Sequence, residues 1–251
     1  MKNAIVYTIV FAGIEILVGS LVLLAYQLLK GTGTELDAMG VIISSGLAGV
    51  VTIAVFLAAK WAVVSRHWIR TRPWTVLFWC VVAILGSLIP SSWLQELMPE
   101  LPNTAEKAFD LVLKDRWGYF IVGLLAPLSE ELVFRGAILR ELLKWKENPW
   151  IGIIISAMLF SLVHMNPVQM PHAFLVGILL GWLYYRTDSI IPGVIWHWVN
   201  NTIAYVMYNL TNPDETLLEY FGSQQRVLMA VGFSLMIFLP ALYQLNQRLS
   251  K

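Results

Sequence analysis

The sequence predicts an all-α membrane protein, a single bundle of eight transmembrane helices with both termini in the cytoplasm. Its composition, the length of its apolar runs and the sorting of its loop charges together predict this fold class. Of the 251 residues, 58% are hydrophobic and only 13% are charged, whereas soluble domains are nearer half apolar and a quarter charged. The net charge of +1 gives no electrostatic reason to expect a nucleic-acid partner. We therefore expect residues 1–251 to form one domain embedded in the lipid bilayer.

Eight apolar runs are the expected spans. The first, 5–29, lacks the small residues of a signal-peptide cleavage site, so we expect it to be retained. The sixth carries Gly177 and Gly181, whose spacing favours close helix contact, and the seventh tolerates Pro192 in its first turn. The runs after the first are 39–64, 74–89, 117–143, 150–164, 171–185, 190–208 and 227–245.

The loops sort by charge. With eight spans, the basic loops 60–72 and 140–146 fall on one side, and the acidic loops 90–116 and 214–219 fall on the other. The positive-inside rule then places both termini in the cytoplasm. Within the segment 90–116, the residues from Thr104 onward are typical of a capped, short amphipathic helix at the membrane interface. A plain loop is the alternative for this segment.

Charged residues interrupt the fourth run. Glu130, Glu131 and Arg135 lie in an otherwise apolar segment, where charges are costly and therefore indicate function. In a helix, Glu131 and Arg135 share one face with the acid before the base. Glu130 is rotated by about 100° from that pair and is free for another role. The alternative is a buried ion pair that only locks two helices together. Near the start of the chain, Glu15 also lies inside a span, but no motif surrounds it, so we expect a bundle-facing acid with a polar partner.

Two further polar clusters lie inside the runs. Phe160 and His164 are four residues apart in the fifth run, and His197 and Asn201 are four apart in the seventh. A lone histidine in an apolar helix is more often a hydrogen-bonding partner than a catalyst. Three helices that each present Glu or His can, however, surround one water molecule inside a dry bundle, where buried polar groups need partners.

These motifs, Glu-Glu-x-x-x-Arg, Phe-x-x-x-His and His-x-x-x-Asn, occur in that order on successive spans. The arrangement resembles the CPBP (CAAX protease and bacteriocin-processing) family of intramembrane proteases, which includes the eukaryotic type II CAAX prenyl endopeptidase. The resemblance covers roughly residues 117–208, which we take as the catalytic core. The short loops and the lack of a targeting segment are typical of a bacterial member, expected as a multi-pass protein of the plasma (inner) membrane.

The resemblance implies a site enclosed by the fourth, fifth and seventh spans, where a peptide bond of a membrane-embedded or lipid-associated protein or peptide is hydrolysed. Neither Cys80 nor a serine is placed as a nucleophile, so the resemblance implies an activated water. Glu130 is then the general base and His164 helps to hold or deprotonate the water. His197 and Asn201 stabilise the oxyanion. The supporting residues are Glu131, Arg135, which orients it, and Phe160.

The same residues fit two mechanisms. One is a glutamate-dependent protease without a metal, and the other is a zinc site with Glu130, His164 and His197 near the ion. The local spacing differs from the His-Glu-x-x-His of zincins. We expect no obligatory cofactor, with Zn as the alternative.

Two alternatives are not enzymes. In an immunity or scaffold protein of the same fold, the cluster would only brace helices, although bracing does not require Asn201 beside His197. In a proton-coupled transporter, Glu130 and the histidines would relay protons. Transporters commonly contain an internal repeat, and the sequence shows none.

Overall fold

The computed structural model describes residues 1–31, 35–64, 74–212 and 215–249, and within these ranges every regular element is a helix. The all-α prediction is therefore confirmed. The basic residues Arg66, Arg70 and Arg72, as well as His67, lie outside the described residues. The helices are α1 (Lys2–Lys30), α2 (Ala38–Ala58), α3 (Trp74–Glu96), α4 (Glu106–Lys114), η2 (Phe120–Leu125), α5 (Ala126–Val133), η3 (Phe134–Leu139), α6 (Arg140–Leu143), α7 (Pro149–Leu162), α8 (Met170–Thr187), α9 (Ile191–Leu210), α10 (Leu217–Phe221) and α11 (Gln224–Arg248).

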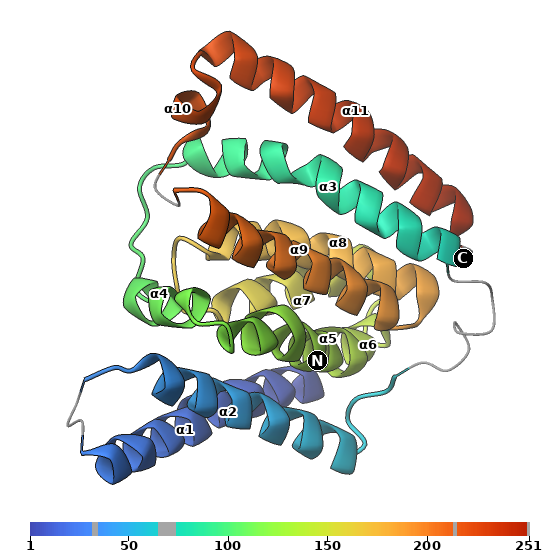
Figure 1. Cartoon of the computed structure of the whole chain (residues 1–251). Coiled ribbons are helices and arrows are strands. Elements are labelled where there is room, and N and C mark those ends of the chain that lie inside the picture. The colour runs from blue at the N-terminus through green and yellow to red at the C-terminus, as the bar shows by residue number, and fades with distance from the viewer. Residues whose placement is uncertain (32–34, 65–73, 213–214, 250–251) are drawn as a thin grey trace.

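The helices form three layers (Figure 1). The pair α1 and α2 makes one outer layer, and the pair α3 and α11 makes the opposite one. The helices from α4 to α9 lie between them, with α7 packed along α8. The helices bearing the three polar motifs are thus held in the middle layer, against which α1 and α2 pack from one side.

Within the described ranges, four helices are long and apolar enough to cross a membrane by length and composition: α1, α2, α3 and α11. The predicted count of eight spans is therefore not confirmed. Helix α7 is apolar but has only 14 residues. It rises about 21 Å, which is short of a hydrocarbon core of about 30 Å.

The fourth predicted span is not one regular helix. It comprises η2, α5, η3 and α6, and both η2 and η3 are π-helical. Pro127 lies in the first turn of α5, directly after the end of η2, where a missing N–H is tolerated. π segments are rare and are found often at functional sites. Here they flank the turn that carries Glu130 and Glu131.

The amphipathic helix expected in the segment 90–116 is α4, but its cap differs from the prediction. Ala105 occupies the N-cap position, while the backbone N–H of Thr104 donates to Asn166 Oδ1 at 3.0 Å. In the middle of α4, Asp110 accepts from Lys114 Nζ at 2.7 Å and from the Tyr208 hydroxyl of α9. Lys114 and then Tyr208 hold the pKa of Asp110 below its ordinary value. These polar contacts dock α4 on α9.

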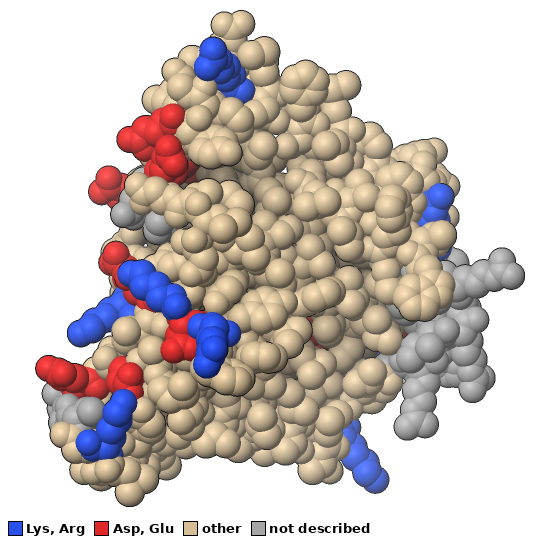
Figure 2. All heavy atoms as spheres, in the orientation of Figure 1, with Lys and Arg blue, Asp and Glu red and all other residues tan. Residues whose placement is uncertain are grey.

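The exposed surface is largely apolar, as expected for a protein in contact with lipid. In Figure 2, charged side chains gather along one edge, over α4, α10 and the connection from α1 to α2, beside a broad face without them. The connections of the helices shown in Figure 1 alternate between this edge and the opposite one. Such a distribution fits an apolar band between two polar rims.

Candidate active site

A buried ion pair anchors the site. Arg135 Nη1 lies 2.7 Å from Glu131 Oε1, and the two side chains are only 1% and 0% exposed. Arg135 Nη2 donates to the carbonyl oxygen of Gly177 on α8 at 3.1 Å, and the guanidinium lies 4.6 Å from the centre of the Phe160 ring. The pair predicted from the spacing therefore exists, and it also ties η3 to α7 and α8. Phe160 therefore packs against the Arg135 guanidinium of this pair in a cation–π contact.

The absence of a side chain at Gly193 lets the Glu131 carboxylate pack directly against α9. A Cβ atom on Gly193 would lie 2.5 Å from Glu131 Oε2, closer than real contacts allow. Only glycine leaves this space at the first turn of α9. No sequence pattern distinguishes Gly193, because the contact depends on how α5 and α9 cross.

His197 lies between the two neighbouring carboxylates. Its Nδ1 is 3.4 Å from Glu131 Oε1, and its Nε2 is 3.7 Å from Glu130 Oε2. Neither separation is a hydrogen bond, and His197 Nδ1 and Glu130 Oε2 are buried without partners. The edge of the Phe160 ring system also packs against the imidazole, with centroids 5.9 Å apart. The motifs of the fourth, fifth and seventh predicted spans therefore converge.

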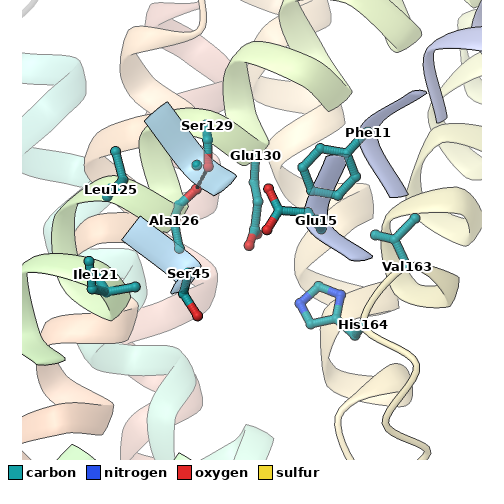
Figure 3. Close-up of a pocket in the computed structure, with 11 residues that line it drawn as sticks. Phe11, Glu15, Ser45, Ile121, Leu125, Ala126, Ser129, Glu130, Val163 and His164 are labelled. Atoms are coloured by element: carbon teal, nitrogen blue, oxygen red, sulfur yellow. Dashed lines mark hydrogen bonds between the residues drawn. The ribbon is translucent and has the colours of Figure 1, made fainter. Parts of the chain in front are cut away.

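A cavity of about 200 Å³ opens beside this cluster, and Glu130 and His164 both line it (Figure 3). Its walls come from α1, α2, η2, α5 and the residues after α7, rather than from the fourth, fifth and seventh spans alone. Neither His197 nor Asn201 is among the lining residues. Those residues are Phe11, Glu15, Ser45, Gly49, Ile121, Leu125, Ala126, Ser129, Glu130, Val163 and His164.

The tautomer of His164 follows from its hydrogen bond. Nδ1 lies 2.8 Å from the carbonyl oxygen of Phe160. Because a carbonyl can only accept, Nδ1 must carry the proton. In the neutral imidazole, Nε2 is then left with a free lone pair, and the ring faces the cavity (Figure 3). Nε2 can accept a proton from a water molecule or serve as a ligand.

Asn201 is held by its neighbours. Its Nδ2 donates to the carbonyl oxygen of Val122 in η2 at 2.9 Å, and its Oδ1 accepts from Asn200 Nδ2 at 3.2 Å. The bond to Val122 joins α9 to η2. Such a bond is expected if Asn201 only holds these two segments together. The amide has two N–H groups, so a second donor is available to a substrate.

A metal ion would need several ligand side chains grouped around one point of this site. Within the part of the chain that the structure describes, no three His, Cys, Asp or Glu side chains are grouped so that they could hold a metal ion as they stand. Glu130, His164 and His197 offer the right donor types, but His164 and His197 do not line the same cavity. Binding a metal through all three would require a rearrangement.

Glu15 was expected to be a bundle-facing acid with a polar partner, and Thr52 is that partner. The Thr52 hydroxyl donates to Glu15 Oε1 at 3.0 Å. The carboxylate nevertheless also lines the cavity of Glu130 and His164. Nothing in the first span signals this position, because the docking of α1 on the middle layer is a long-range contact.

Comparisons with known proteins define the class to which this arrangement belongs. Residues 113–203 match the family model described as type II CAAX prenyl endopeptidase Rce1-like, so this segment is similar to the Rce1-like CAAX proteases. The resemblance inferred from the three motifs is confirmed. The matched segment contains all seven motif residues.

Parts of the chain are also similar to individual proteins, one of which is named a CAAX protease. The chain is 27% identical over 139 residues to the UPF0177 protein YxdF of Lactococcus lactis, covering 55% of this chain and 69% of that protein. It is 30% identical over 150 residues to the membrane-embedded CAAX protease MroQ of Staphylococcus aureus, covering 57% and 60%. An uncharacterized 24.3 kDa protein of Escherichia coli is 31% identical over 87 residues, covering 32% and 39%. No solved structure matches.

Proposed function

We propose that this protein is an intramembrane endopeptidase that hydrolyses a peptide bond of a membrane-embedded or lipid-associated protein or peptide. The observation that carries the proposal is the joint placement of Glu130 and His164 at one cavity, next to a second carboxylate, Glu131, that is ion-paired with Arg135. The family match and the similarity to MroQ, which is named a membrane-embedded CAAX protease, point the same way.

In this mechanism, Glu130 is the general base. A water molecule in the cavity attacks the scissile carbonyl carbon as its proton passes to Glu130, with the free Nε2 of His164 holding the water. Breakdown of the tetrahedral intermediate breaks the C–N bond, and the proton passes to the leaving amine. Arg135 pairs with Glu131 and holds it in place, so the two adjacent acids have different tasks in this mechanism.

His197 and Asn201 would stabilise the oxyanion. A neutral imidazole donates from one nitrogen, and His197 lies beside the base with 3.7 Å between Nε2 and Glu130 Oε2. Asn201 lies one turn further along α9, and its second N–H is the donor. Neither side chain lines the cavity. For this role, either the substrate extends past Glu130, or α9 moves toward the substrate.

We infer that the chemistry needs no obligatory metal, because the base and the water-holding group are both supplied by side chains. The alternative is a zinc ion near Glu130, His164 and His197, which would supply a Lewis acid. Treating purified protein with 1,10-phenanthroline and measuring both turnover and metal content separates these cases. Turnover that persists after zinc has been removed supports the glutamate-dependent mechanism, and parallel loss of both contradicts it.

The proposed setting is the plasma (inner) membrane, crossed eight times with both termini in the cytoplasm. The alternating connections of the helices support this count, although α7 to α9 are short or polar for full spans. In the middle layer, such helices can be surrounded by protein rather than by lipid.

The experiment that tests the function compares membrane peptides in cells that contain the wild-type protein or its Glu130→Gln variant. An endopeptidase predicts at least one membrane protein or peptide that is intact with the variant and cleaved with the wild type. Identical peptide profiles at equal protein levels would instead favour the scaffold alternative. A difference in proton flux without cleavage would favour the transporter.

A further inference from the structure

Glu15 faces the proposed base from a different layer of the protein. In Figure 3, the carboxyl groups of Glu15 on α1 and Glu130 on α5 point toward one another across the cavity, with His164 beside them. Helix α1 lies outside the residues 113–203 that match the family model. Glu15 is therefore a feature of this chain that the family assignment does not explain.

The position of the Glu15 carboxylate is fixed, yet only part of it is satisfied. Thr52 on α2 donates to Oε1 at 3.0 Å, and no hydrogen bond to Oε2 is found within the described ranges. Oε2 is also not among the buried atoms without partners. One oxygen is thus bound to the bundle, and the other is open to the cavity.

Among the described residues, no lysine or arginine lines the cavity. Of the eleven lining residues, the charged ones are Glu15 and Glu130, and none is Lys or Arg. Arg135, which belongs to the same cluster of motifs, is 1% exposed and is bound to Glu131 and Gly177. It is therefore not available to Glu15. Two carboxyl groups that face each other in an apolar environment repel when both are charged, and a cation between or beside them removes that repulsion.

We propose that Glu15 is a specificity-determining residue that binds the cationic side chain of a Lys or Arg flanking the scissile bond of the substrate. This inference rests on the proposed peptidase function. A bound ammonium or guanidinium pairs with Glu15 Oε2 and leaves Glu130 free to act as the base. Substrates with a neutral side chain at that position lack this interaction, so the site discriminates between them by charge. The role of Thr52 is to orient the carboxylate toward the cavity.

The test uses a positional-scanning library of internally quenched peptides with an apolar anchor, presented to the purified protein in proteoliposomes. Each position carries Lys, Arg, norleucine or citrulline, so that charge changes at nearly constant shape. For the wild type, we expect kcat/KM at one position to favour Lys over norleucine by at least about tenfold, as for close charge pairs of low exposure. In Glu15→Gln, that ratio should fall to about one.

Further variants separate specificity from folding. Glu35→Gln, an exposed acid after α1, is the matched control and should keep the wild-type ratio. If Glu15→Gln fails to fold, Glu15→Asp and Thr52→Val replace it, since each keeps the charge but misplaces it. Both should lower the ratio at least about twofold, with thermal denaturation as the check on folding.

Each outcome is decisive. Cleavage that depends on Glu130 but shows no preference for Lys or Arg at any position overturns this inference and leaves the proposed function standing. A cation preference that Glu15→Gln retains also overturns it. If the wild type cleaves no peptide faster than Glu130→Gln does, the proposed function fails, and the role of Glu15 fails with it.

Discussion

Glu130 and Glu131 are chemically identical neighbours, but their surroundings differ. The Glu131 side chain is fully buried against Arg135, Gly193 and His197. The Glu130 side chain is 20% exposed and borders the cavity. A helix turns by about 100° per residue, so adjacent carboxylates necessarily face different partners. This separation is the reason to assign the base to Glu130.

We predict that Glu130→Gln abolishes peptide hydrolysis while the folded protein remains abundant. Glutamine keeps the shape of the side chain but cannot accept a proton at neutral pH, and no ion pair at hydrogen-bonding distance is lost. Turnover in proteoliposomes, together with the melting temperature, checks this. Near-normal turnover would show that another group is the base.

Loss of either member of the buried ion pair should act mainly on stability. Glu131→Gln or Arg135→Ala strands a charge that is at most 1% exposed, and breaking such a pair costs about 3–5 kcal/mol. Denaturation in detergent should therefore show both variants to be far less stable than Glu130→Gln. Equal stability of all three variants would contradict the division of tasks between the two acids.

Asn201→Ala should lower kcat by about 10²–10³, with little change in KM, if its second N–H stabilises the oxyanion. Asn201→Asp should be at least as damaging, because it places an acceptor against a developing negative charge. Asn200, which donates to Asn201, provides the control. Equal losses in Asn200→Ala and Asn201→Ala that follow the amount of folded protein would instead assign Asn201 to the bond with Val122.

At the scale of the element, close packing of α7 on α8 positions the ion pair. A Cβ atom on Gly177 would lie 3.0 Å from Ala157 Cβ and 3.1 Å from its Cα, so the small-residue face predicted from Gly177 and Gly181 is confirmed. The close approach also brings the Gly177 carbonyl to Arg135. The spacing of α7 and α8 thereby helps to position Arg135, the ion-pair partner of Glu131.

Gly177→Val should therefore destabilise the protein by about 1–3 kcal/mol, the usual cost of overpacking, and should reduce turnover by displacing Arg135. Gly232→Val in α11 is the matched control, since a Cβ atom there has no neighbour within 4 Å. Comparing the melting temperatures of the two variants separates the effect of overpacking from the effect of replacing a helical glycine. Equal effects would show that the contact with Ala157 is unimportant.

At the scale of the whole molecule, the three layers make the proposed cavity a joint product of distant segments. Helices α1 and α2 lie outside the matched residues 113–203, yet they supply Phe11, Glu15, Ser45 and Gly49 to its wall. The family segment thus carries the motifs, and the N-terminal pair closes the space beside them.

The proposed topology predicts that a cysteine at Ser92 reacts with a membrane-impermeant maleimide from outside the cell, while one at Lys146 reacts only from the cytoplasmic side. Both positions are exposed. The single native cysteine, Cys80, is fully buried, so background labelling should be low. Ser65 and Ser250, two further labelling positions expected on the cytoplasmic side, lie outside the described residues. Labelling of Ser92 from the cytoplasm would contradict eight spans with both termini inside.

The sequence by itself determined the fold class, the ion pair of Glu131 with Arg135 and the resemblance of residues 113–203 to the Rce1-like CAAX proteases. Apolar composition, helical spacing and short motifs are local properties, and they can be read without knowing how helices cross. The small-residue contact of Gly177 is of the same kind, because its spacing lies on one helix face.

Only the tertiary structure decided which groups share the cavity. Glu15 and Glu130 are separated by more than a hundred residues, and Gly193 matters only because α5 crosses α9 beside it. The same holds for Asn201, whose bond to Val122 joins α9 to a π segment that no pattern predicts. The physical reason is that helix periodicity fixes which face a residue occupies, whereas packing between helices fixes what that face meets.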